Sequence, residues 1–186
     1  MRIVAGKFRG AHIEAPKGLV ARPTSDRVRQ ALFNVLEHGA PGFDFEGARV
    51  LDLFAGSGAL GIEALSRGAR YCLFIEESAA ARAAIRRNVE ALGLTGATKI
   101  WRRDATKLGD AGTLQPFRLI FCDPPYGKGL GEQALAEAVN RGWAEQGAIA
   151  VLEESADAEI AWPPSFEEID RRRYGDTQIA IARANH

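Results

Sequence analysis

The stretch RVLDLFAGSGALG, residues 49–61, determines the fold that this sequence can adopt. It begins as an apolar run typical of a buried parallel strand and continues into a glycine-rich turn that opens a helix ending near Arg67. Gly56, Gly58 and Gly61 follow the GxGxxG spacing, in which small residues let the backbone approach a ligand at the amino end of a helix. The stretch therefore predicts the start of a nucleotide-binding α/β sheet.

The remainder of the chain alternates strand-like and helix-like segments. The tail predicts two further strands joined by a turn at Gly175 and Asp176. Seven strands result, in a Rossmann-like, doubly wound and mostly parallel sheet with one antiparallel strand. We expect the first to begin at 49 and the others at 71–76, 97–104, 119–122, 147–154, 166–174 and 177–182.

The amino-terminal part of the chain differs in charge from the rest. Residues 1–38 contain seven basic and three acidic residues, which gives them a net charge of +4 against −4 for the remainder. Residues 1–16 predict a small hairpin with a basic loop, and a helix follows that Thr24, Ser25 or Asp26 caps. We therefore expect a basic extension, 1–40, on a main domain, 41–186. A solvated surface face explains the charge equally well.

If the extension grips a polyanion, its polar side chains contact phosphate groups. The residues expected to do so are Lys7, Arg9, Arg22, Thr24, Arg27 and Arg29.

Length and composition restrict the class of protein. The chain has 186 residues, 46% hydrophobic and 26% charged, as expected for one globular domain with a real core. No apolar run approaches the roughly 20 residues of a membrane span, and the amino terminus has no hydrophobic signal core, so a cytoplasmic protein is expected. Cys72 and Cys122 lie in apolar runs and predict buried thiols, and three scattered histidines predict no metal site.

The stretch LIFCDPPY, residues 119–126, is the strongest indication of chemistry. Pro124 and Pro125 remove two backbone donors, which leaves the carbonyls of Asp123 and Pro124 available to a ligand at the carboxyl end of a strand. Two acceptors there could hold the hydrogens of an exocyclic amino group and make its nitrogen nucleophilic, while Tyr126 stacks on the base. The alternative is a rigid turn that closes a core strand.

Acidic residues near the strand ends indicate the cofactor. Glu76 lies about twenty residues after the first glycine, where a carboxylate can bind both hydroxyls of a ribose in either a dinucleotide or S-adenosylmethionine. Asp52 would repel a pyrophosphate but could orient the cationic amino-acid end of S-adenosylmethionine; the alternative is a carboxylate that caps the loop amides. Asp104, followed by Ala105, could accept from the adenine amino group or simply cap a helix.

These motifs, in this order and spacing, resemble class I S-adenosylmethionine-dependent methyltransferases that act on an amino group. The segments MRIVAGKFRG (1–10) and RPTSDRVRQALFNVL (22–36), with LEES (152–155), resemble the RsmD family of bacterial 16S rRNA guanine-N2 methyltransferases. The resemblance covers essentially the whole chain. It implies a catalytic DPPY tetrad, an amino-terminal extension that contacts RNA, and a monomer that methylates one guanine in 16S rRNA, either naked or within the small subunit or an assembly intermediate.

Three other functions remain open on the residues alone. A methyltransferase for DNA adenine-N6 or for a protein amide would keep the tetrad and change the substrate. An NAD-dependent oxidoreductase would use the glycine loop and Glu76, but it leaves DPPY and the basic extension unexplained. A non-catalytic RNA-binding module would leave the glycine loop empty.

Overall fold

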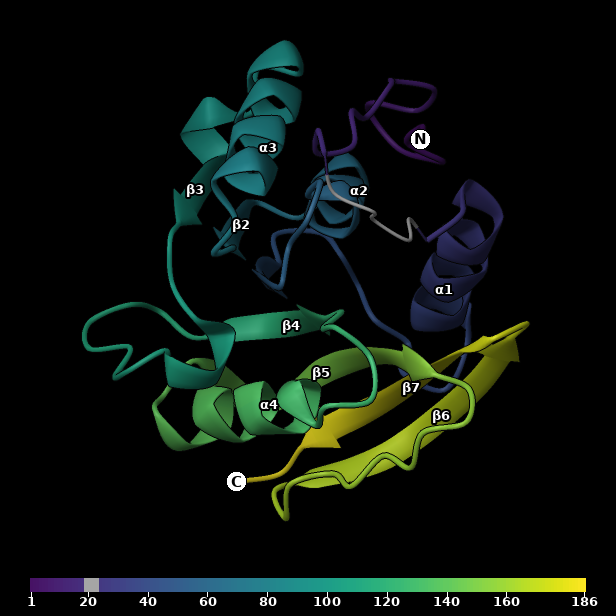
Figure 1. Ribbon diagram of the computed structural model, residues 1–186, viewed down its shortest axis with the longest axis vertical. Helices are drawn as coiled ribbons and strands as arrows, with labels where there is room; N and C mark the ends of the chain where they lie inside the picture. The colour runs from purple at the N-terminus through teal and green to yellow at the C-terminus, as the bar shows by residue number, and fades with distance from the viewer. Residues whose placement is uncertain (19–23) are drawn as a thin grey trace.

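The computed structural model describes residues 1–18 and 24–186, and they form one seven-stranded sheet in the order β3-β2-β1-β4-β5-β7-β6 (Figure 1). Strands β1 to β5 pair in parallel, and β7 pairs antiparallel with both of its neighbours. The predicted doubly wound, mostly parallel sheet with one antiparallel strand is thus confirmed. The strands are β1 Arg49–Leu53, β2 Tyr71–Ile75, β3 Thr98–Trp101, β4 Phe117–Cys122, β5 Ala144–Ser155, β6 Phe166–Tyr174 and β7 Thr177–Ala184.

Helices cover both faces of this sheet. Helices α1, α2 and α3 lie on one face, and α4 with the short 3-10 helix η2 lies on the other (Figure 1). Ser25 caps α1, because its Oγ accepts from the amide of Val28 at 3.2 Å. The helices are α1 Asp26–His38, α2 Ala59–Ser66, α3 Ala79–Ala91, η1 Thr95–Ala97, η2 Ala105–Lys107 and α4 Leu130–Asn140.

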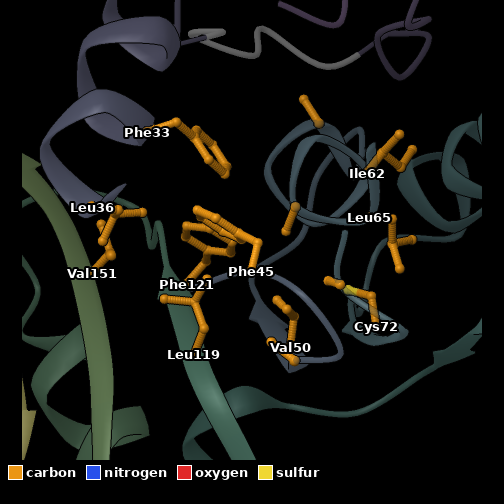
Figure 2. Close-up of a cluster of buried hydrophobic side chains, with 14 of the residues drawn as sticks. Phe33, Leu36, Phe45, Val50, Ile62, Leu65, Cys72, Leu119, Phe121 and Val151 are labelled. Atoms are coloured by element: carbon orange, nitrogen blue, oxygen red, sulfur yellow. The ribbon is translucent and has the colours of Figure 1, made fainter. Parts of the chain in front are cut away.

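The apolar residues of the central strands divide between the two faces. Leu119 and Phe121 of β4 join the cluster beneath α1 and α2, whereas Cys122 joins the cluster beneath α4. Figure 2 shows Phe33 of α1 pointing toward Phe45 and Phe121, and the ring centroids lie 5.3 and 5.7 Å apart. These contacts fix α1 to the middle of the sheet.

The amino-terminal segment forms a hairpin with very little regular pairing. Arg2 and His12 make an isolated antiparallel bridge, and the amide of Ile3 donates to the carbonyl of Ala11 at 2.9 Å. The expected hairpin is therefore present, although neither arm is a full strand. Most of the segment's other hydrogen bonds go to helices, because buried amides need a partner.

This extension shares its core with the sheet. Ile3, Ile13 and Phe33 belong to the same hydrophobic cluster as Val50 and Phe121. The extension, 1–40, and the main domain, 41–186, are therefore packed together without a gap. Their division stays a prediction about which part contacts RNA.

Several strand boundaries differ from those expected, and the clearest cases are the end of the third strand and the start of the fifth. The third strand ends at Trp101, where its pairing with Ile75 of β2 ends. Beyond it, the Arg103 guanidinium turns back over the Trp101 ring, 4.8 Å from its centroid, and donates to the carbonyl of Leu108 at 2.8 Å. The fifth strand begins earlier, at Ala144, which pairs with Phe117 across an irregularity in the register.

The expected buried thiols are confirmed. Cys72 and Cys122 are free and buried, and burial raises the pKa of both thiols well above the usual range. Within residues 1–18 and 24–186, no helix is long and apolar enough to cross a membrane.

Candidate active site

A cavity of about 820 Å³ opens at the carboxyl ends of the central strands. The glycine loop after β1, the residues that follow β2 and β3, the DPPY segment after β4 and the end of β5 all contribute to it. The amino-terminal segment adds Met1, Ala15, Pro16 and Thr24, so it forms part of the wall. The other lining residues are Arg29, Phe54, Gly56, Ser57, Ala59, Leu60, Glu76, Glu77, Ala81, Asp104, Thr106, Asp123, Pro124, Pro125, Tyr126, Leu130 and Glu153.

The glycine loop has the backbone that its sequence requires. Gly56 and Gly58 have φ angles of 59° and 80°, in the left-handed region that favours glycine. A Cβ on Gly61 would lie 2.6 Å from Cys72 Sγ and from Phe74 Cε1, so α2 packs closely on β2 only because this residue is glycine. Among the described residues, Phe54 is the one non-glycine residue with positive φ, 56°, and it marks the sharp exit of the chain from β1.

Glu76 is positioned as its spacing predicted, at the rim of the glycine loop. Its Oε1 accepts from the amide of Gly56 at 2.8 Å, and its Oε2 accepts from the amide of Ser78 at 2.9 Å. The half-buried carboxylate also lines the cavity. A ligand hydroxyl that approaches Glu76 therefore meets a carboxylate of fixed orientation.

Asp52 is not among the residues that line the cavity, so the structure gives no support to its expected contact with the cofactor, which stays a prediction. It is 2% exposed, and its Oδ2 accepts from the amide of Gly61 at 3.1 Å. It supplies the helix cap that Gly58, which has no side chain, cannot give to α2. Burial raises its pKa well above the usual range, and the nearby Glu76 raises it further.

Asp104 lines the cavity but also caps the next helix. Its Oδ1 accepts from the amide of Thr106 at 2.8 Å and from the Thr106 hydroxyl at 2.7 Å, and these bonds lower its pKa. Ala105, the first residue of η2, is buried in the cluster on the α4 face and does not line the cavity, so the structure gives it no ligand contact through its side chain.

Asn88 of α3 connects the glycine loop to the amino-terminal segment. Its Nδ2 donates to the carbonyl of Ser57 at 2.9 Å and to the carbonyl of Glu14 at 3.0 Å, and its Oδ1 accepts from the Glu14 amide at 2.9 Å. The side chain is 3% exposed. Asn88 is not among the residues expected from the sequence, although an asparagine on the apolar side of an alanine-rich helix is a usable signal.

The DPPY segment is held from its carboxyl side. The Tyr126 hydroxyl lies 3.1 Å from Thr177 Oγ1, and the amide of Gly127 donates to Glu154 Oε1 at 2.9 Å. Glu154, from LEES, is 2% exposed and also accepts from the amide of Ser155. The structure therefore brings all four tetrad residues to the cavity wall and assigns to Glu154 a positioning role that the motif alone did not reveal.

Thr24 reaches the same wall from the other end of the chain. Its hydroxyl donates to Glu153 Oε1 at 3.0 Å, across 129 positions of sequence. Both residues line the cavity beside Asp123. Glu153 was not among the expected site residues.

The basic residues of the extension separate into two groups. Lys7, Arg9 and Arg27 are exposed, as phosphate contacts require, and Arg22 lies outside the described residues. Arg29 is fully buried and already paired, so the structure gives no support to its expected contact with phosphate. Its guanidinium forms ion pairs with Asp26 at 3.0 Å and Glu63 at 3.7 Å, and it donates to the carbonyl of Arg2.

Glu63, also fully buried, explains why Arg29 turns inward. Its carboxylate accepts from the amides of Val4 and Ala5 at 2.8 and 3.1 Å and from Arg67 Nε at 3.1 Å. A buried carboxylate needs compensating positive charge, which Arg29 and Arg67 provide. This cluster attaches the extension to α2.

The cavity is strongly acidic. Five carboxylate residues line it in the described part of the chain, and the one basic side chain there, Arg29, is already paired. A pyrophosphate would meet repulsion in this environment, whereas a cationic ligand would be attracted. The lining therefore suits a ligand that carries positive charge.

Comparisons with known proteins agree with this geometry. The protein family described as "Conserved hypothetical protein 95" matches residues 1–183. The chain is 36% identical to "Putative rRNA methyltransferase YlbH" of Bacillus subtilis over 186 residues, 97% of each chain. It is 34% identical to "Ribosomal RNA small subunit methyltransferase D" of Escherichia coli over 173 residues, 93% of this chain and 84% of that protein.

A solved structure shares the architecture. The structure of "Putative methyltransferase yhhF" from Escherichia coli superposes with a TM-score of 0.85 at 33% identity, covering 100% of this chain and 98% of that one. The match to the family extends over both the amino-terminal extension and the sheet. The chain therefore belongs to the RsmD family of methyltransferases, and its fold is that of a class I methyltransferase.

Proposed function

We propose that this enzyme transfers a methyl group from S-adenosylmethionine to the exocyclic N2 amino group of one guanine in bacterial 16S rRNA. The observation that carries the proposal is the DPPY segment at the wall of an acidic cavity that also contains a glycine loop and Glu76. The names of the relatives from Escherichia coli and Bacillus subtilis support rRNA as the substrate. An rRNA substrate also supports action in the cytoplasm, and we propose that the enzyme acts as a monomer.

The residues of the cavity fit this cofactor better than a dinucleotide. S-adenosylmethionine carries a sulfonium and an ammonium group against one carboxylate, so five acidic lining residues attract it and would repel a pyrophosphate. Glu76 would hold the ribose hydroxyls, and Asp104 would hold the adenine amino group. The backbone at Gly56 would contact the amino-acid part of the cofactor. Bound there, the cofactor supplies a methyl group activated by positively charged sulfur.

The DPPY segment and the neighbouring end of β5 form the target half of the cavity, which would orient the guanine; the glycine loop, Glu76 and Asp104 form the cofactor half. Asp123 and the carbonyl of Pro124 accept the two N2 hydrogens, which reduces the delocalisation of the nitrogen lone pair into the ring and directs it at the methyl group. Tyr126 stacks on the flipped or unpaired base, and Pro125 keeps the turn rigid. Orientation and proximity account for most of the rate, because the leaving group is already activated. Asp123 accepts the proton released as the N–C bond forms.

RNA would be gripped by the exposed basic residues of the extension, Lys7, Arg9 and Arg27, together with Arg22 and the neighbouring Thr24. Replacing Lys7, Arg9 and Arg27 by glutamine should flatten the salt dependence of RNA binding, by about 0.7 to 0.9 in log–log slope for each lost phosphate contact. An unchanged slope would contradict this assignment. Arg86→Gln, at an exposed position on α3, is a matched control for charge removal.

The decisive experiment offers the purified enzyme labelled S-adenosylmethionine with undermethylated naked 16S rRNA, small ribosomal subunits and duplex DNA. Mass spectrometry then identifies the modified nucleoside. N2-methylguanosine, lost in Asp123→Ala, is the expected product. The comparison of naked rRNA with subunits identifies which form of the rRNA is the substrate. N6-methyladenine would overturn the substrate, and no label despite tight cofactor binding would overturn the proposed reaction.

A further inference from the structure

A second carboxylate, Glu153, lies beside Asp123 on the neighbouring strand. Cys122 of β4 pairs with Leu152 of β5, so the next two residues in this register are Asp123 and Glu153, with strands about 4.8 Å apart. Phe121 and Val151, two positions earlier, belong to the cluster on the α1 and α2 face, and alternation directs Asp123 and Glu153 to that face as well. Both residues line the cavity.

Glu153 is oriented but retains capacity to accept hydrogen bonds. It is 8% exposed, and in the described part of the chain its side chain accepts one hydrogen bond, from Thr24 to Oε1. A carboxylate can accept about four. Holding a threonine hydroxyl requires only a neutral acceptor, and a mostly buried charge is costly unless further donors meet it. The geometry therefore favours a donor that arrives from the cavity.

The Watson–Crick edge of guanine supplies that donor. Guanine presents its N1–H directly beside the N2 amino group, whereas adenine presents an N1 acceptor beside its N6 amino group. We propose that Glu153 is the specificity-determining residue that accepts the N1–H of the target guanine, while Asp123 and the Pro124 carbonyl hold its N2 amino group. The inference rests on the proposed function. It explains how a DPPY segment, which could hold any exocyclic amino group, rejects adenine: the N1 lone pair of adenine would face the carboxylate.

The test uses a base that keeps the N2 amino group and lacks the N1–H. Once product analysis has located the methylated nucleotide, RNA assembled by splinted ligation carries guanine or 2,6-diaminopurine at that position. Single-turnover methylation is measured for both RNAs with the wild type, Glu153→Gln and Glu153→Ala. The wild type should prefer guanine by roughly 10- to 100-fold, the effect of one hydrogen bond to a charged group. In both variants the ratio should fall below about threefold.

Glu154→Gln is the matched control. Glu154 is the adjacent carboxylate, alternation places it on the other face of β5, and it holds the amides of Gly127 and Ser155. Its loss should slow methylation of both RNAs by the same factor and leave their ratio at the wild-type value. Because the readout is a ratio within each variant, partial loss of active protein does not affect it.

The outcomes separate this inference from the function on which it rests. A wild type that methylates the guanine RNA and the diaminopurine RNA equally would show that N1–H is not read, and Glu153 variants with an unchanged ratio would show that another group reads it. Either result overturns the role of Glu153 alone. Product analysis that finds the methyl group on a base other than guanine, or on a guanine atom other than N2, overturns the proposed function itself.

Discussion

The two halves of the cavity are held in different ways. In the cofactor half, carboxylates accept backbone amides close in sequence or on the next strand: Glu76 holds Gly56 and Ser78, and Asp104 holds Thr106. In the target half, the contacts join distant segments, such as Tyr126 with Thr177 and Thr24 with Glu153. The carboxylates of the first half thus act locally, and the link of Asn88 to Glu14 is the exception there, while the second half depends on how the whole chain folds. Substitutions in each half should accordingly affect different steps of the reaction.

Asp123→Ala should give the largest effect. Because Asp123 is proposed to orient the reacting nitrogen, we expect the single-turnover rate to fall about 1000-fold, while the dissociation constant of S-adenosylmethionine changes by less than about threefold. Stopped-flow or quench methylation and isothermal titration measure the two quantities separately. Equal losses in rate and cofactor affinity would place Asp123 in the cofactor half instead and remove the distinction.

Glu76→Gln should give the opposite pattern. Glutamine supplies one acceptor oxygen where Glu76 uses two, so the glycine loop loses an anchor and the ribose loses a charged partner. We expect cofactor affinity to fall roughly 10- to 100-fold and the rate at saturating cofactor to stay within a few-fold. Glu90→Gln removes the same charge from the exposed side of α3 and is the control. A rate loss at saturation that matches the affinity loss would contradict the assignment.

Asn88→Ala tests whether the amino-terminal segment supports the cofactor half. The substitution leaves two carbonyls and one amide, at Ser57 and Glu14, without their side-chain partner. Unfolding should become easier by about 2 kcal/mol, and cofactor affinity should fall about tenfold as the loop loosens.

The control for Asn88 is Glu14→Ala, which removes only the exposed pair with Arg87 and leaves the backbone contacts of residue 14 in place. It should change neither quantity appreciably. If Asn88→Ala destabilises the fold while cofactor affinity is unaltered, the residue serves packing alone.

This contrast also explains which parts of the site could be read from the sequence. The glycine loop, Glu76 and DPPY could be predicted, because each is a short motif whose geometry follows from strand ends and backbone restrictions. The sheet was predictable for the same reason: apolar runs and turn residues specify strands locally. The pairing of Thr24 with Glu153 could not be predicted, since it joins residues 129 positions apart.

Arg29 and Asp52 show the other limit of sequence reasoning. Both are charged residues that local sequence placed at a ligand, and both are buried in the structure, where they satisfy groups of the protein itself. Arg29 turns inward because Glu63, on a different helix, needs a cation. A charge pattern gives the net charge of a segment, but it does not reveal which charge a neighbouring element requires.

Asp52→Asn should have the smallest effect on activity. It tests a residue that supports the glycine loop without lining the cavity. An asparagine oxygen can still accept the amide of Gly61, so cofactor affinity should change by less than about threefold. The effect should appear in stability as a function of pH. Burial raises the pKa of Asp52 in the folded state, so folding binds a proton that the unfolded chain has already released.

The contribution of the Asp52 carboxyl is therefore most favourable in acid and declines as pH rises from its unfolded pKa toward its folded pKa. Relative to Asp52→Asn, the wild type should lose up to about 1.4 kcal/mol of unfolding free energy per pH unit across that window, and nothing further above it. Urea unfolding of both proteins from pH 4 upward measures the difference, in which the titration of other groups cancels. Parallel curves would mean that Asp52 titrates normally, and that its carboxylate meets more polar surroundings than the amide of Gly61 provides.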